Sequence, residues 1–388
     1  MKSTFATLVL LLHSLLPHAH GVGIPNPNVH KRASKPLGLP SNGLAKNCIA
    51  IGFLPSDGSS QSPPYTMAKI NSALALPGGA STYGRYAQIT SAASFSGDQL
   101  LSQLSDIKAS GAVFVASVMP SIPFSSVTST TANAVAAVLK KFTDEGIHVW
   151  LRFAHEMNWY VQDGTYHGSP SEFLSAWKTM YAANCAGNEM VSCFWSPNCA
   201  SASSLQAWWP GPETVDIVGV DCYPKTINTN AFETAYGDFY NTFSKPHGLP
   251  FAIGETGAGG GDRETWLKML VAKEMKQKYP DYVSLSWFEF DKEADFRIVM
   301  GDSGTLGQTK SVLAQAEGDV TCGGAQQLPT SKSAVGVPSK SGVVGPTPVK
   351  SSPAKPTATA CDWGCWGWDC SAKVPCQSPW TCKGGYCK

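Results

Sequence analysis

Eight short apolar runs alternate with longer segments of helical spacing between residues 48 and 290. The runs are rich in β-branched and aromatic residues, which favours strands, and the alternation indicates repeated βα units around a parallel sheet. Strands are expected at residues 48–54, 81–86, 112–119, 147–153, 191–195, 215–221, 250–255 and 283–290, and helices at 99–108, 132–145, 170–184 and 262–279. Eight such units in one region predict an α/β fold, a (β/α)8 TIM barrel.

The competing fold is an open doubly wound sheet, which carries a glycine-rich phosphate loop after its first strand. Residues 54–58, after the first expected strand, lack the G-x-G-x-x-G turn. A later glycine-rich stretch, residues 257–261, has no Lys-Ser/Thr and follows a late strand. Nucleotide binding therefore has no support, and we expect no cofactor.

The two ends of the chain differ in composition from this region. Residues 1–21 have the layout of a secretory signal peptide, too short in its apolar run for a bilayer span of about 20 residues. Residues 22–32 end in Lys31-Arg32, either a processing site of a propeptide or a charged spot in a loose leader. The barrel is expected at 33–322, a Pro/Ser/Thr-rich linker at 323–360 and a small Cys-rich module at 361–388.

Charge and cysteine content indicate the compartment of the protein and the class of its binding partner. A formal charge of +1 gives no field for nucleic acid or an acidic membrane, so a neutral polymer is the better partner, with no nucleic acid or membrane involved. The 12 cysteines indicate disulfides in an oxidising compartment, hence a secreted, extracellular protein, which we expect to be a monomer. Cys185, Cys193, Cys199 and Cys222 are expected to staple loops after the fourth to sixth strands. A zinc site is the alternative, but the C-x-x-C spacing and a His pair are missing, so no metal is expected.

Polar residues gather where the fourth and seventh expected strands end. The fourth delivers Arg152, His155, Glu156 and Asn158, and the seventh delivers Glu255. The carboxyl ends of the strands form the active site of a (β/α)8 barrel. Two carboxylates on opposed strands suit a retaining glycosidase, in which one protonates the leaving oxygen and the other attacks the anomeric carbon. A solvated or ion-paired carboxylate is the alternative for each. Two other strand-end acids are alternates: Asp221 and Glu289.

Three segments carry a family resemblance in the family's order. R-F-A-H-E-M-N followed by Trp, at residues 152–159, resembles the acid/base motif of glycoside hydrolase family 26. F-W-S-P-N at 194–198, and W-W-P-G at 208–211 with V-D-I-V-G-V-D-C-Y at 215–223, are similar to two further segments of that family. The resemblance implies a retaining β-glycanase on a (β/α)8 barrel, with Glu156 as acid/base and Glu255 as nucleophile.

The resemblance also assigns supporting roles. His155 would contact substrate and help tune Glu156, or it would be a core histidine satisfied by a backbone carbonyl. Tyr223 would hold the nucleophile through a hydrogen bond from its hydroxyl. Arg152 would orient Glu255 and keep it ionised, with a purely structural ion pair as an equal contender.

Four tryptophans are candidates for stacking on sugar faces. The resemblance places Trp287 as the flat floor beneath the sugar at the cleavage point. Trp159, Trp208 and Trp209 lie in loops after strands, and packing beneath a loop is the better expectation for at least one of the adjacent pair. Many family members have a Gly and one more residue before the aromatic, whereas here Trp159 follows Asn158 at once. The loop that shapes the sugar subsites therefore departs from the family pattern.

The sequence thus predicts a secreted retaining endo-β-glycanase, with mannan as leading substrate because β-mannanase is the family's commonest activity. A mixed-linkage or other β-glucan is the nearest alternative, and a non-catalytic polysaccharide-binding wall protein is the alternative of another class. The terminal module has too little apolar area for a core, so three disulfides must hold it. Its four tryptophans suit attachment to an insoluble polysaccharide, as in fungal cellulose-binding modules, although the Cys spacing does not match. A toxin- or inhibitor-like knot is the alternative.

Overall fold

The computed structural model describes residues 35–259, 262–314, 382–383 and 386–387. The expected signal peptide, propeptide, linker and most of the Cys-rich module lie outside these residues. Within the module, β10 (Cys382–Lys383) and β11 (Tyr386–Cys387) form an antiparallel pair.

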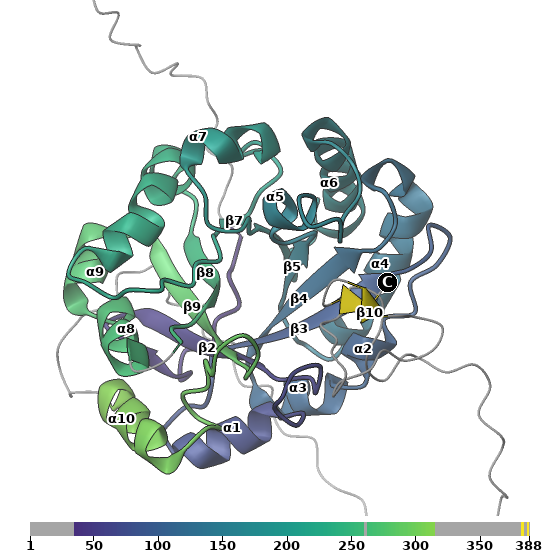
Figure 1. The fold of residues 1–388 in the computed structure, drawn as a ribbon. Coiled ribbons are helices and arrows are strands. Elements are labelled where there is room, and N and C mark those ends of the chain that lie inside the picture. Colours follow the sequence, from purple (N-terminus) through teal and green to yellow (C-terminus); the bar gives the residue numbers. More distant parts are fainter. Residues whose placement is uncertain (1–34, 260–261, 315–381, 384–385, 388) are drawn as a thin grey trace, which may run out of the picture. The chain divides into compact units, whose positions relative to one another are not determined.

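Eight parallel strands form a closed barrel, which confirms the predicted fold (Figure 1). They are β2 (Ile49–Pro55), β3 (Thr82–Ile89), β4 (Val113–Pro120), β5 (Val149–Phe153), β6 (Val191–Trp195), β7 (Ile217–Val218), β8 (Phe251–Thr256) and β9 (Tyr282–Glu289). Each strand pairs with the next in the chain, and β2 pairs with β9 from Ala50↔Ser284 to Pro55↔Glu289. A short β1 (Ala45–Lys46) runs antiparallel to β2. Only β7 is much shorter than expected, and isolated bridges continue its path at Asn198↔Asp221 and Cys222↔Thr256.

Helices surround the strands (Figure 1). They are α1 (Met67–Leu74), α2 (Asp98–Leu101), α3 (Leu104–Ser110), α4 (Ser129–Thr143), α5 (Met157–Tyr160), α6 (Pro170–Asn184), α7 (Ala202–Leu205), α8 (Arg263–Leu270), α9 (Lys273–Lys278) and α10 (Ser303–Leu313). Short 3-10 turns occupy Phe124–Ser126, Gln206–Trp208 and Lys245–His247, and π-helical turns occupy Glu233–Gly237 and Tyr240–Ser244. The expected helix at 262–279 is broken at Ala272, whose backbone is extended. No helix in the described ranges is long and apolar enough to cross a membrane.

The apolar core has two main layers. The larger layer packs between the strands and the helices, and a smaller cluster fills the barrel near its amino end, including Val113, Val115, Trp150, Phe194 and Ile217.

The segment before β1 closes the amino end of the barrel. Leu39 joins the inner cluster, and Leu37 packs against it while its carbonyl accepts a hydrogen bond from Trp150 Nε1 at 2.8 Å. Lys35 Nζ bonds to Val191 O at 3.0 Å and to the buried carboxylate of Asp216 at 3.2 Å. These contacts make the start of the described chain part of the barrel.

Two disulfides have both cysteines in the described ranges, and they join neighbouring parts of the barrel in the region where the sequence predicts such links. Cys185–Cys193 connects the end of α6 to β6, and Cys199–Cys222 connects the loop after β6 to the residue that follows Asp221.

Candidate active site

Glu156 enters the barrel through an unusual turn at the end of β5. Ala154 and Glu156 both have left-handed backbones, with φ of 48° and 52°. Such a conformation costs a non-glycine residue about 1 to 2 kcal/mol, so the surroundings must hold it. Glu156 N donates to Ser196 O at 2.8 Å, just beyond β6. The turn thus places the carboxyl group, only 6% exposed, at the carboxyl end of the barrel.

Glu255 lies on β8, where the register with β9 shifts between Ile253 and Thr256. Glycine is required at the preceding residue, because a Cβ on Gly254 would lie 2.4 Å from both Asp221 Oδ1 and Ser196 Oγ. The strand can therefore approach Asp221 closely. Tyr223 donates its hydroxyl to Glu255 Oε2 at 2.8 Å, as the resemblance implies for the nucleophile's partner.

Arg152 is fully buried on β5 and bonds to two carboxylates. Its Nη1 donates to Glu255 Oε1 at 2.8 Å and to Ser117 Oγ at 2.9 Å, and its Nη2 pairs with Asp221. Asp221 also accepts from Ser196 Oγ at 2.8 Å. Both sequence interpretations of Arg152 therefore describe part of what it does, since it orients Glu255 and forms a buried ion pair with Asp221.

The two glutamates have pKa values shifted in opposite directions. Burial first, then the negative charges of Asp221 and Glu255, raise the pKa of Glu156 well above 4.5, against the opposing charge of Arg152. Burial alone would also raise the pKa of Glu255, but the charges of Arg152 and His155 and the Arg152 hydrogen bond outweigh it and lower that pKa to about 2. At mildly acidic pH, Glu156 is thus protonated and Glu255 ionised, the states that an acid and a nucleophile need.

The carboxyl groups lie close together. One oxygen from each of Glu156, Asp221 and Glu255 lies within 4.8 Å of the others. Retaining glycosidases have carboxyl groups about 5 to 5.5 Å apart, and inverting ones about 6.5 to 9.5 Å, to leave room for a water molecule. The spacing fits the retaining class. Such an oxygen set can also bind a cation, but Arg152 already bonds to two of the three carboxylates and supplies the positive charge.

His155 lies inside the site as a neutral ring. Its Nε2 is 3.6 Å from Glu255 Oε1, and the ring lies between Tyr86 and Tyr160, with centroids 5.4 and 5.5 Å away. Burial, followed by the charge of Arg152, lowers its pKa to about 3. Its Nδ1 has no hydrogen-bond partner in the described part of the chain, so the alternative of a core histidine bonded to a carbonyl does not fit.

Asn158 supports the site rather than its chemistry. Its Nδ2 donates to Asn198 O at 3.0 Å, and its Oδ1 accepts from Asn198 N at 2.8 Å. This pair of bonds ties the turn that carries Glu156 to the loop after β6. The partly buried Asn198 side chain also contributes to the pKa of Glu156, in the lowering direction.

The loop tryptophans separate into an exposed and a packed set. Trp159 is 50% exposed on α5, three residues after Glu156, and is the exposed large apolar side chain of the described residues. Trp208 is partly buried with its ring edge-on to Phe173, 5.7 Å away. Trp209 packs against Trp195 and other rings, so it is the member of the pair that lies beneath a loop.

Trp287 does not lie where the resemblance places it. Its ring is fully buried in the layer between strands and helices, and Nε1 donates to Phe296 O at 2.8 Å. The next residue, Phe288, is the one that packs with Leu54 and Tyr223 on the inner side of the strands. The expectation that Trp287 forms an open floor for a sugar is therefore wrong for this structure.

The structure adds Tyr86, to which the sequence assigned no role. Tyr86 lies on β3 beside His155, and its side-chain hydrogen bond helps to lower the pKa of Glu255. Of the alternate acids, Asp221 belongs to the site as the second partner of Arg152. Glu289 is fully buried, and its oxygens accept backbone N–H groups of Ile298 and the next two residues.

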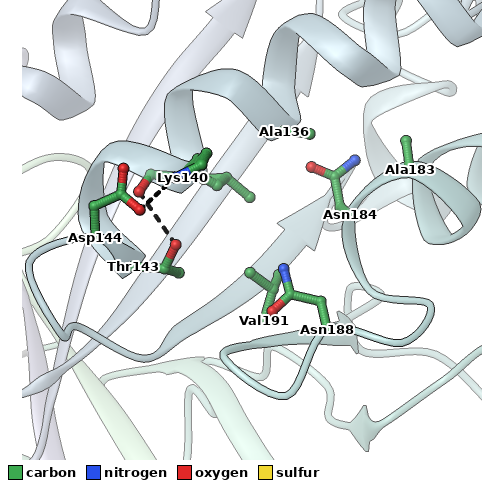
Figure 2. Close-up of a pocket in the computed structure, with 9 residues that line it drawn as sticks. Ala136, Lys140, Thr143, Asp144, Ala183, Asn184, Asn188 and Val191 are labelled. Carbon is green, nitrogen blue, oxygen red and sulfur yellow. Dashed lines mark hydrogen bonds and ion pairs between the residues drawn. The ribbon is translucent and has the colours of Figure 1, made fainter.

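A separate hollow of about 300 Å³ lies on the outer side of the barrel between α4 and α6 (Figure 2). Its lining includes Lys140, Thr143 and Asp144 from the end of α4, Asn184 at the end of α6, and Asn188 in the segment between α6 and β6. None of the strand-end residues described above contributes to it.

One family model matches the chain. The sequence model of glycosyl hydrolase family 26 matches residues 117–305, which include Arg152, Glu156, Tyr223 and Glu255. No curated protein sequence matches the chain. Among solved structures, a mannanase from Bacillus subtilis has a TM-score of 0.47 at 19% identity, covering 65% of this chain and 83% of its own. A family 26 β-mannanase from Bacteroides ovatus has a TM-score of 0.45 at 15% identity, covering 68% and 87%. A modular endo-β-1,4-mannanase from Cellulomonas fimi has a TM-score of 0.47 at 18% identity, covering 69% and 71%.

Proposed function

Because the barrel belongs to glycoside hydrolase family 26, we propose that this glycoside hydrolase is a secreted, retaining endo-β-glycanase that cleaves a polysaccharide by double displacement. One observation carries the mechanism. Glu156 and Glu255 have carboxylate oxygens within 4.8 Å of each other and pKa values shifted in opposite directions. That arrangement provides a proton donor and an ionised nucleophile in one site.

In the first displacement, Glu255 attacks the anomeric carbon while Glu156 gives its proton to the leaving glycosidic oxygen. The bond from the anomeric carbon to that oxygen breaks, and an ester between the sugar and Glu255 forms. Arg152 and Tyr223 hold the two oxygens of Glu255, so the lone pair that attacks is fixed in direction.

In the second displacement, Glu156, now ionised, removes a proton from water as the water attacks the same carbon. The ester bond to Glu255 breaks, the carboxylate is restored, and Glu156 ends protonated. Two inversions leave the sugar with its original configuration. The negative charge on Glu255 is lost and regained in this cycle, which is consistent with the raised pKa of Glu156 in the free enzyme.

The proposed substrate is a β-1,4-mannan. This choice follows from β-mannanase being the commonest activity of the family rather than from a contact in the site. The exposed ring of Trp159, next to the turn that carries Glu156, offers a surface on which a sugar ring can stack. A buried acid and a buried nucleophile in one site also argue against a purely sugar-binding wall protein, because binding alone needs neither state.

The test is hydrolysis of a polysaccharide panel by the full chain. Mannan, galactomannan, glucomannan, mixed-linkage β-glucan and β-1,3-glucan are assayed for released reducing sugar, with Glu255→Ala as the inactive control. We expect mannans to be cleaved, with a rapid fall in viscosity from internal cuts. NMR of the first product should show the β anomer. An initial α product contradicts retention, and cleavage of glucans alone replaces mannan as substrate.

A further inference from the structure

Two buried side chains of β9 anchor the segment that follows this strand. Trp287 Nε1 donates to Phe296 O at 2.8 Å. Glu289 accepts three backbone N–H groups, from Ile298 at 3.1 Å, Val299 at 2.7 Å and Met300 at 2.6 Å. Neither residue is part of the double displacement described above.

These bonds are costly to lose. Both side chains are fully buried, so a removed partner leaves polar backbone groups without water to replace it. An unsatisfied buried group loses its hydration with no bond in return, and this cost is enough to shift a short segment rather than leave the groups unpaired. Trp287 and Glu289 therefore fix the path of the chain on both sides of Arg297.

The anchored segment carries Phe296 against the residue that holds the nucleophile. The Phe296 ring lies 5.4 Å from the Tyr223 ring, centroid to centroid, and the Phe288 ring lies edge-on to Tyr223 at 5.6 Å. A Cβ on Gly257 would lie only 2.9 Å from Phe296, so the chain directly after β8 passes close to this ring. Tyr223 in turn donates its hydroxyl to Glu255 Oε2 at 2.8 Å.

We propose that Trp287 and Glu289 are positioning residues that hold Phe296 against Tyr223 and thereby hold the nucleophile Glu255 in its attacking orientation. The inference rests on the proposed function, in which Glu255 attacks the sugar. It gives Trp287 a role behind the site in place of a sugar floor.

Two conservative variants test this. Glu289→Gln keeps the shape but replaces one acceptor oxygen by a donor, and Trp287→Phe keeps a ring but removes the N–H. Each should lower kcat on the best soluble polysaccharide about tenfold with KM unchanged, since small misplacement of reacting groups is expensive. If Trp287 instead stacks on the sugar, Trp287→Phe raises KM, and the proposal is wrong.

A double-mutant cycle separates positioning from general damage. Tyr223→Phe removes the hydroxyl through which the effect must pass, so adding Glu289→Gln to it should cost no further kcat. If kcat of the combined variant falls by the product of the two single-variant factors, the proposal is wrong. Asp216→Asn is the matched control, because Asp216 also accepts a backbone N–H, from Cys193 at 2.8 Å, but lies at the amino end of the barrel. It should lower the melting temperature without lowering kcat at 25 °C.

A crystal structure of Glu289→Gln gives a readout that does not depend on turnover. The distance from Tyr223 Oη to Glu255 Oε2 should exceed the 2.8 Å of the unaltered protein. An unchanged distance contradicts the positioning role. If the unaltered protein cleaves no polysaccharide, the proposed function fails, but this distance still decides whether the anchor acts on Glu255.

Discussion

At the scale of single residues, one guanidinium sets the charge of the site. Arg152 bonds to Glu255 and Asp221, and among its side-chain bonds none reaches Glu156. The charge of Arg152 therefore stabilises the ionised form of Glu156 less than that of Glu255, so Glu156 holds a proton while Glu255 stays ionised. The difference between the two glutamates follows from which of them the arginine touches, although both are buried. The contact does not act in the same way on Asp221, because burial outweighs the charge of Arg152 there and raises the pKa of Asp221 to about 8.

The first prediction concerns pH. Turnover needs Glu255 ionised and Glu156 protonated. At low pH, kcat/KM should therefore fall only near the pKa of Glu255, about 2, where Glu255 takes up a proton. At high pH, kcat/KM should fall where Glu156 loses its proton, and the pKa of that group lies well above 4.5. Tyr223→Phe removes a donor to the ionised carboxylate and should move the acid limb upward with the alkaline limb unchanged. The profile of kcat/KM on a soluble polymer measures both limbs. An acid limb near the ordinary value in the unaltered protein contradicts the assignment.

The second prediction separates the two glutamates. Glu255→Ala should abolish turnover on every substrate, because no ester can form. Glu156→Ala should lose about 10² to 10⁴-fold on polysaccharide, the typical contribution of general acid catalysis, and lose far less on aryl glycosides whose leaving groups need no proton. Glu145→Ala, at an exposed glutamate paired with Lys108, is the control and should be unchanged. Equal losses for Glu156→Ala on both substrate types are incompatible with these roles.

At the scale of elements, β9 shows what the sequence could and could not predict. The strand was expected at nearly its observed position, but all eight of its residues are buried. A strand covered on both faces has no alternation of polar and apolar residues from which to tell the inner face. Inside the barrel, Ser286 bonds to Thr82 at 3.0 Å and Phe288 meets Tyr223, which leaves Trp287 outside. Only the packing of neighbouring strands reveals this.

Helix ends were more predictable where local signals were strong. Helix α6 begins after Ser169 as expected, because Ser169 and Glu172 form a capping box and Pro170 occupies the first turn. The π-helical turns in residues 233–244 were not predicted. Their register includes Gly237, which lowers helix propensity, and tertiary packing of Tyr236 and Tyr240 stabilises them instead.

The third prediction uses the buried carboxyl group of β9. Burial raises the pKa of Glu289 from 4.5 to about 7, although three backbone N–H groups and Arg297 oppose it. The folded protein therefore binds more protons than the unfolded chain between these values, and stability falls as pH rises through that window. The free energy of unfolding, measured with urea, should fall between about pH 5 and about pH 8, and it should fall less for Glu289→Gln than for the unaltered protein. Equal losses contradict a raised pKa at this position.

The fourth prediction compares Cys199–Cys222 with Cys185–Cys193, the disulfides whose cysteines both lie in the described ranges. Cys222 lies between Asp221 and Tyr223, so Cys199–Cys222 holds the chain at the site, whereas Cys185–Cys193 joins α6 to β6. Replacing both cysteines of either pair by serine should lower stability, by about 1 kcal/mol more for Cys199–Cys222, which spans 23 residues rather than 8. Only the Cys199→Ser/Cys222→Ser variant should also lower kcat. A similar fall in kcat for the other pair means that this disulfide has no special role at the site.

At the scale of the whole molecule, the fifth prediction concerns the terminal module. The described barrel spans residues 35–314 with a gap at 260–261, and the family model matches 117–305. The role of 361–388 stays a prediction from cysteine and tryptophan content. A chain ending at residue 322 should hydrolyse soluble polymer as fast as the full chain does, and should hydrolyse insoluble particles more slowly. Particles of cellulose, chitin, mannan and β-1,3-glucan are used for retention and turnover. Equal retention of both chains on all four contradicts attachment through the module.

Residues 35–39 close the amino end of the barrel, and this limits where a shortened gene for this enzyme can begin. A fragment that starts at Gly38 leaves the Asp216 carboxylate without the Lys35 ammonium and the Trp150 indole without the Leu37 carbonyl. A domain boundary placed at the first barrel strand would remove these residues, because β2 starts only at Ile49. Expression plasmids and fusion partners should therefore keep Lys35.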